Sequence, residues 1–184
     1  MRIAVIGTGG VGGYFGARLS EAGEDVTFIA RGAHLEAMKN KGLAIHSPLG
    51  NMHLDKIQCT DDPSTIAPVD IVMIAVKLWA TNEAIEAARP LLSEGTGIIS
   101  FQNGILAEEL LLKAFTKTHA MGGVANIAAL IEEPGVIRHN GTMASLFFGE
   151  LDNESSSRSK LLLEACEKAN ITASIPEDIN RAIW

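Results

Sequence analysis

The sequence has few cysteines and no excess of positive charge, and each shortage excludes a class of protein. Its only cysteines, Cys59 and Cys166, form neither a C-x-x-C pair nor a Cys/His metal spacing. We therefore expect two free, packed thiols in a reducing compartment and no metal site. Because the formal net charge is −7, neither nucleic acid nor an anionic membrane is expected as a partner.

Long apolar runs are also missing. No run reaches the roughly 18 residues that a membrane span requires, and the chain begins on strand-like residues from Arg2 without the pattern of a signal peptide. We therefore expect a cytoplasmic location. The chain has 184 residues, of which 47% are hydrophobic and 20% charged. Such a composition is typical of a soluble globular protein with one domain and some extension.

The strongest pattern is a buried strand, residues 2–6, followed at once by a G-x-G-x-x-G turn and a helix. In such a turn the first glycine permits the bend, the second lets a pyrophosphate approach the backbone, and the third allows close packing of helix on strand. The N–H groups and dipole of the helix N-terminus then bind the phosphates. The pattern predicts dinucleotide binding, with a purely structural glycine turn as the alternative. The predicted cofactor-binding residues are Gly7, Thr8, Gly9, Gly10, Val11 and Gly12.

The next strand, residues 25–30, indicates which dinucleotide is preferred. It follows a helix that we expect to end at Gly23. An NAD site usually carries Asp or Glu at the tip of this strand for the ribose 2′-OH, whereas an NADP site carries Arg for the 2′-phosphate. Here Arg31 follows the strand, and no carboxylate stands at its tip. We expect NADP as cofactor, with a solvated surface arginine as the alternative role of Arg31.

Two further polar residues follow apolar strands. Residues 70–76 form the clearest central strand and lead to Lys77, and residues 97–101 lead to Gln102-Asn103-Gly104. Ligands of open α/β sheets bind beyond the carboxyl ends of the strands. Lys77 and Asn103 are therefore predicted to face the cofactor crevice. The alternatives are an exposed charge and a turn-forming Asn-Gly pair.

The remaining patterns predict an α/β fold: a Rossmann-type, doubly wound, mainly parallel sheet with added antiparallel strands. The Asn140-Gly141 pair predicts a hairpin between two of these strands, and Pro134-Gly135 predicts another turn. Residues 126–131 are apolar but ambiguous. Further helices are predicted over residues 33–41 and 80–92, from residue 107, and over 160–169; further strands over 43–46, 51–54, 57–59, 119–124, 136–139, 144–149 and 171–175.

The last residues, from Asp178, are typical of the first turns of a helix, and the sequence stops at the apolar Trp184. We expect residues 1–175 to form an NADP-binding Rossmann-like domain and residues 176–184 to begin a C-terminal helical domain that this chain lacks. An exposed apolar patch is expected around Trp184, where that domain would dock.

Taken in order, several motifs resemble the N-terminal nucleotide-binding domain of the ketopantoate reductase (2-dehydropantoate 2-reductase) family, over essentially the whole chain. The resemblance implies that the glycines hold the pyrophosphate and that Arg31 holds the 2′-phosphate of NADP. It also implies that Lys77 lines the cofactor site and that Asn103 contacts the nicotinamide side and the substrate. The motifs are Gly7 to Gly12, Arg31, Val76-Lys77-Leu78-Trp79, Gln102-Asn103-Gly104, Pro134-Gly135, and Asp178-Ile179 with Trp184.

The resemblance implies a reaction as well: hydride transfer from NADPH to the ketone of 2-dehydropantoate, giving pantoate for pantothenate and coenzyme A biosynthesis. Charge that develops on the ketone oxygen requires a proton donor. In the family this donor is a lysine two residues beyond the tryptophan that matches Trp184, and Lys77 and Asn103 have supporting catalytic roles. We therefore expect the 184-residue chain alone to be inactive.

Two alternatives to this function stay open at the level of the sequence. One is a paralogous NADPH-dependent reductase of another 2-keto acid. The other is a non-catalytic nucleotide-binding module. The expected partner is a small-molecule 2-keto acid, and the sequence leaves open a homodimer of the full-length form.

Overall fold

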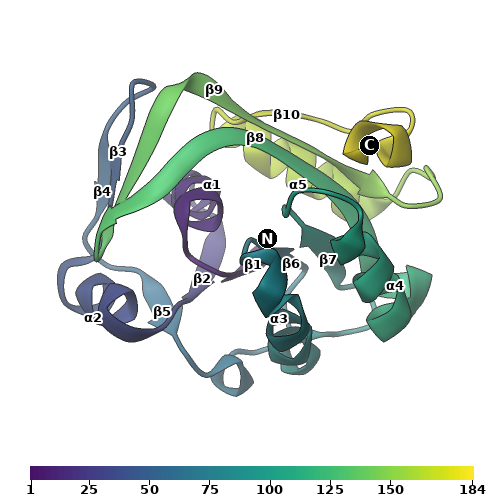
Figure 1. Ribbon diagram of the computed structural model, residues 1–184, viewed down its shortest axis with the longest axis horizontal. Helices are drawn as coiled ribbons and strands as arrows, with labels where there is room; N and C mark the ends of the chain where they lie inside the picture. Colours follow the sequence, from purple (N-terminus) through teal and green to yellow (C-terminus); the bar gives the residue numbers. More distant parts are fainter.

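The computed structural model describes residues 1–184 and contains ten strands and six helices (Figure 1). The strands are β1 (Arg2–Ile6), β2 (Asp25–Ile29), β3 (Leu43–His46), β4 (Met52–Leu54), β5 (Gln58–Thr60), β6 (Ile71–Ile74), β7 (Gly97–Ser100), β8 (Ala120–Glu133), β9 (Val136–Glu150) and β10 (Thr172–Ser174). The helices are α1 (Gly10–Glu21), α2 (Gly32–Lys41), α3 (Thr81–Ala88), α4 (Leu106–His119), α5 (Ser157–Lys168) and α6 (Ile179–Ile183). Three short 3₁₀ helices are η1 (Pro63–Thr65), η2 (Leu78–Ala80) and η3 (Arg89–Leu91).

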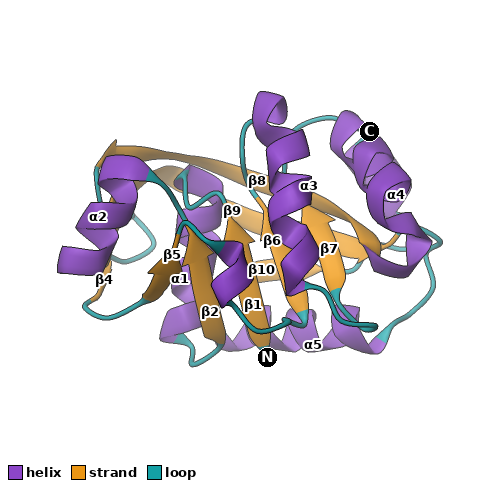
Figure 2. Cartoon of the chain, turned by 90° about the horizontal axis from the view of Figure 1, so that it is seen from below, coloured by secondary structure: helices purple, strands orange, loops and turns teal.

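All ten strands belong to one sheet, in the order β4-β3-β9-β8-β7-β6-β1-β2-β5, with β10 paired to β9. From β5 through β2, β1, β6 and β7 to β8, every neighbouring pair is parallel (Figure 2). Beyond β8 the sheet is mixed, because β8 and β9 are antiparallel, as are β3 and β4. The predicted fold class, a mainly parallel Rossmann-type sheet with added antiparallel strands, is confirmed.

Helices cover both faces of the sheet. Because successive side chains of a strand point to opposite faces, alternate residues of one strand pack against different helices. In β1, Ile3 and Val5 belong to a core cluster shared with α1 and α5, whereas Ala4 and Ile6 belong to a second cluster shared with α3 and α4. Strands buried on both faces read as continuous apolar runs. This two-sided burial explains why β1 and β6 could be recognised from the sequence.

β8 and β9, of 14 and 15 residues, arch over α1 (Figure 1). The prediction of two strands over 136–139 and 144–149 with a hairpin at Asn140-Gly141 was wrong, since β9 is continuous. Its pairing with β8 shifts by several residues between Ala128 and Ile127, so that residues 141–143 bulge out of the ladder. The hairpin between β8 and β9 lies instead at Pro134-Gly135, which the sequence predicted as a turn.

Other differences concern the bounds of elements. The helix predicted over 80–92 ends at Ala88 and is followed by η3, because Pro90 has no N–H to continue the α-helical ladder. The ambiguous residues 126–131 belong to β8. Both cysteines are free, as expected. None of the helices combines the length and the apolar character needed to cross a membrane.

The C-terminal helix α6 packs on β8 and β9 through Ile179, which is buried against Gly122. Asp178 caps this helix by accepting a hydrogen bond from the N–H of Arg181. Trp184 is 88% exposed, and the apolar patch expected around it stays a prediction. The division of the chain at residue 175 stays a prediction.

Candidate functional site

The glycine turn joins β1 to α1 and leaves open space on one side. Gly7 has φ +94°, and a Cβ on Gly12 would lie 2.3 Å from the carbonyl oxygen of Gly7, so the bend and the close approach both require glycine. Gly9, the N-cap residue of α1, differs because a Cβ there would meet nothing within 4 Å. The turn therefore exposes backbone at Gly9 to any ligand in the crevice.

The N-terminus of α1 suits an anion. No side chain caps this helix, and its first turn has no acidic residue. The first intrahelical hydrogen bond runs from the N–H of Gly13 to the carbonyl oxygen of Gly9 at 2.7 Å, so the N–H groups of residues 10–12 have no partner within the helix. These N–H groups and the helix dipole fit the pyrophosphate of a dinucleotide.

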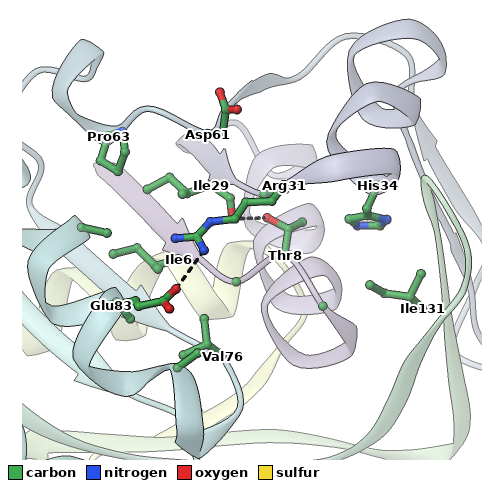
Figure 3. Close-up of a pocket in the computed structure, with 16 residues that line it drawn as sticks. Ile6, Thr8, Ile29, Arg31, His34, Asp61, Pro63, Val76, Glu83 and Ile131 are labelled. Carbon is green, nitrogen blue, oxygen red and sulfur yellow. Dashed lines mark hydrogen bonds and ion pairs between the residues drawn. The ribbon is translucent and has the colours of Figure 1, made fainter.

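A pocket of about 250 Å³ opens beside this turn, at the carboxyl ends of β1 and β2 (Figure 3). This volume is slightly below the roughly 300–1,000 Å³ that is typical of pockets for drug-sized ligands. The apolar lining of the pocket includes residues of β1, β2, α3 and β8. The residues used below that line it are Gly7, Thr8, Gly9, Arg31, His34, Asp61 and Glu83.

The guanidinium of Arg31 reaches into this pocket and pairs there with a carboxylate (Figure 3). Its Nη1 lies 2.9 Å from Oε2 of Glu83, in the first turn of α3. As the sequence indicated, β2 itself has no carboxylate at its tip. However, Glu83 and Asp61 bring two carboxylates into the pocket from other parts of the chain. One sequence feature could have indicated Glu83. It lies in the first turn of α3, the helix after β6, and the N-terminus of this helix must approach the crevice.

His34 forms another part of the wall. Its Nδ1 accepts a hydrogen bond from the N–H of Gly135 at 3.0 Å, so in the neutral ring the proton is on Nε2. This Nε2 is buried without a hydrogen-bond partner. Burial lowers the pKa of His34, opposed by the backbone of Thr8. A neutral His34 thus ties α2 to the turn between β8 and β9, a contact that sequence reasoning missed.

Lys77 and Asn103 occupy equivalent places on adjacent strands. Each stands three residues beyond the end of its strand, β6 for Lys77 and β7 for Asn103, and these strands pair in parallel with Ile74 opposite Ser100. Both residues are exposed. Neither lines the pocket that contains Arg31. They share the carboxyl edge of the sheet with that pocket but lie outside it, on the β6–β7 side.

A buried amide connects the two loops that carry Lys77 and Asn103. The Nε2 of Gln102 donates to the carbonyl oxygen of Val76 at 2.9 Å and to Oγ1 of Thr81 at 3.0 Å. Its Oε1 accepts from Oγ of Ser100 at 3.2 Å. Because Val76 precedes Lys77 and Gln102 precedes Asn103, this bridge fixes the backbone next to both. Gln102 was part of a sequence motif but had no role assigned to it.

Fold and site together define a Rossmann-type nucleotide-binding domain of the dehydrogenase kind. The sequence profile of the family described as "Ketopantoate reductase PanE/ApbA" matches residues 3–153, and the chain belongs to this family.

Individual relatives agree with this assignment. The chain is 35% identical over all 184 residues to the "Uncharacterized oxidoreductase YkpB" of Bacillus subtilis (strain 168), and 34% identical over the same length to the 2-dehydropantoate 2-reductase of Archaeoglobus fulgidus. It covers 60% and 58% of these proteins. The crystal structure of 2-dehydropantoate 2-reductase from Geobacter metallireducens matches the whole chain with a TM-score of 0.93 at 34% identity, and 60% of that structure is covered. The chain thus spans about three fifths of these relatives.

A more distant structure shows only the fold. D-mandelate dehydrogenase in complex with NADH and anilino(oxo)acetate has a TM-score of 0.88 but 21% identity.

Proposed function

We propose that the protein is an NADPH-dependent 2-dehydropantoate 2-reductase that supplies pantoate for pantothenate and coenzyme A biosynthesis, with this chain as its cofactor-binding part. The observation that carries the proposal is the guanidinium of Arg31 in one pocket with the open glycine turn. Membership of the ketopantoate reductase family supports the reaction.

Each part of this site would bind one part of the cofactor. The N–H groups at the start of α1 would bind the pyrophosphate, and Gly9 would leave room for it. Arg31 would bind the 2′-phosphate, a charge-assisted contact worth about 1.5–3 kcal/mol, or roughly tenfold to a hundredfold in affinity. NADPH bound in this way supplies the hydride.

Lys77 and Asn103 would act at the substrate end of the site. Reduction of a ketone places negative charge on its oxygen, and an ammonium and an amide N–H both stabilise such charge. Their equivalent positions beyond β6 and β7 allow both to face one substrate. Gln102 would keep their backbones in register through its hydrogen bond to Val76.

A second candidate is the reduction of another 2-keto acid. It stays a candidate because the chain covers only 60% of the relative at 35% identity, and residues in the remaining part of such a protein can also contact the substrate.

The experiment that separates these functions is an NADPH oxidation assay of the protein expressed from its complete reading frame. Its substrates are 2-dehydropantoate, pyruvate and 2-oxoisovalerate. The proposal expects kcat/KM for 2-dehydropantoate to exceed the others by about a hundredfold. Preference for another keto acid would establish the second candidate. NADPH binding without turnover of any of them would indicate a non-catalytic module.

A further inference from the structure

The ion pair between Arg31 and Glu83 lies where the pocket would receive the 2′ substituent of the adenosine ribose. Nη1 of Arg31 is 2.9 Å from Oε2 of Glu83, and both residues line the pocket that contains Gly7 and Gly9 (Figure 3). The pair joins the end of β2 to the first turn of α3. The arginine proposed to bind the phosphate therefore already has an anionic partner in the protein.

This pair is easily opened by a ligand. The side chains of Arg31 and Glu83 are 70% and 65% exposed, and an ion pair between such groups contributes little to stability because water and salt screen it. The hydrogen bond between them is the only one that either side chain makes. A ligand that offers Arg31 a phosphate can replace Glu83 without breaking any other side-chain hydrogen bond.

The two side chains favour different nucleotides. A guanidinium forms strong, often bidentate contacts with a phosphate. A carboxylate accepts hydrogen bonds from the hydroxyls of an unphosphorylated ribose, as Asp or Glu does in NAD sites. The same carboxylate repels a 2′-phosphate, whose charge is about −1.5 to −2 near neutral pH. The pocket thus contains a guanidinium that favours NADPH and a carboxylate that favours NADH, and the two groups are in contact.

We propose that Glu83 is a specificity-determining residue that reduces the preference of the site for NADPH over NADH. Without nucleotide it holds Arg31; with NADH it accepts a ribose hydroxyl; with NADPH it must give up Arg31 and tolerate a nearby phosphate. The inference rests on the proposed function, because it concerns the same cofactor site. It adds that the wild-type protein binds both cofactors, with a preference for NADPH smaller than Arg31 alone would give.

The test compares Glu83→Gln with the wild-type protein, because this change keeps the size of the side chain and removes its charge. Dissociation constants for NADPH and NADH are measured by titration of nicotinamide fluorescence. NADPH is expected to bind the variant about threefold to tenfold more tightly. NADH is expected to bind it no better, or more weakly.

The matched control is Glu86→Gln. Glu86 lies on the same helix, pairs with Arg89 at 2.8 Å and does not line the pocket, so it reports the effect of losing one negative charge nearby. The ratio of the two dissociation constants should stay within about twofold of wild type in this variant. An equal change in both variants would overturn the proposal, because the effect would then be a general one of net charge.

Two other outcomes would also overturn it. Weaker NADPH binding by Glu83→Gln would mean that Glu83 holds Arg31 ready for the phosphate. An unchanged cofactor ratio in Glu83→Gln, in a protein whose NADPH binding depends on Arg31, would remove the role of Glu83 and leave the proposed function intact. Binding of neither nucleotide by the wild-type protein would overturn the cofactor assignment together with this inference.

Discussion

Gly10, the first residue of α1, lies against the backbone of Ala129 in β8. A Cβ on Gly10 would come within 2.1 Å of the carbonyl oxygen of Ala129, whereas a Cβ on the preceding Gly9 would meet nothing within 4 Å. The arch of β8 therefore packs directly on the N-terminus of the helix proposed to bind the pyrophosphate. Two adjacent glycines of one turn thus have different physical requirements, one for packing and one for ligand access.

This difference predicts opposite effects of two alanine substitutions. Gly10→Ala should lower the free energy of unfolding by about 1–3 kcal/mol, because β8 or α1 must shift. Gly9 has φ −84°, so Gly9→Ala should change stability by only about 0.5 kcal/mol. It should weaken NADPH binding at least about tenfold, because its methyl group enters the path of the pyrophosphate. Urea denaturation and calorimetry measure the two effects, and equal destabilisation by both would be evidence against this packing.

Glu108 on α4 makes stability depend on pH. It is 6% exposed, and neither carboxylate oxygen has a hydrogen-bond partner of good geometry. Burial, the larger of two opposing causes, raises its pKa from 4.5 to about 7, and its own backbone N–H lowers it. The folded protein holds the Glu108 proton more tightly than the unfolded chain does. The contribution of the protonated Glu108 to the free energy of unfolding is therefore lost as the pH rises from about 4.5 to about 7.

Glu108→Gln should therefore be more stable than wild type by about 1–3 kcal/mol at pH 8, and most of this difference should be absent at pH 5. Denaturation at the two pH values measures it, with the exposed Glu109→Gln as the control. A difference that does not change with pH would show that Glu108 does not titrate in this range.

Cys166 tests the packing of α5 on the sheet. It is fully buried, and burial raises the pKa of its thiol to about 12, whereas Cys59 is only partly buried. Since the thiolate is the reactive form, a disulfide reagent such as DTNB should modify one thiol per native chain and the second only after unfolding. Cys59→Ser should abolish the reaction of the native protein. Rapid modification of both thiols would mean that α5 is not packed as described.

Gln102 should affect turnover more than cofactor binding. Gln102→Leu leaves the Val76 carbonyl and two hydroxyl groups without their amide partner, at a cost of about 1–3 kcal/mol in stability. Loosening the loops of Lys77 and Asn103 should lower kcat about tenfold, whereas NADPH affinity should change less than about threefold. The exposed Gln58→Leu is the control. A loss of affinity with unchanged kcat would place Gln102 in the binding of NADPH instead.

The sequence predicted those features that depend on short segments. The turn from Gly7 to Gly12, its helix and Arg31 lie within one βαβ unit, where residue type and spacing decide the conformation. The path of β9 could not be predicted in the same way, because Asn140-Gly141 suits a bulge as well as a hairpin. Only its pairing with β8, a contact outside the segment, decides between them.

In the candidate site, too, positions set by a short segment could be predicted, and contacts between distant segments could not. The place of Arg31 beside the crevice could be predicted from its position after β2. Its pairing with Glu83 could not, because Glu83 lies 52 residues further along and contacts Arg31 only through the packing of α3 beside β1. The bridge from Gln102 to Val76 likewise spans 26 residues. The roles of Lys77 and Asn103 at the carboxyl edge of the sheet stay predictions.

The most direct test of the central claim is a calorimetric titration of the protein with NADPH and NADH, repeated with Arg31→Ala. The account predicts tighter binding of NADPH by the wild-type protein, and a loss of that advantage in the variant, whose affinity for NADPH should fall to about that for NADH. Such a result would support the pocket between the glycine turn and Arg31 as the cofactor site. Equal binding of NADPH by wild type and Arg31→Ala would contradict the role of Arg31, and with it the assignment of NADP as cofactor.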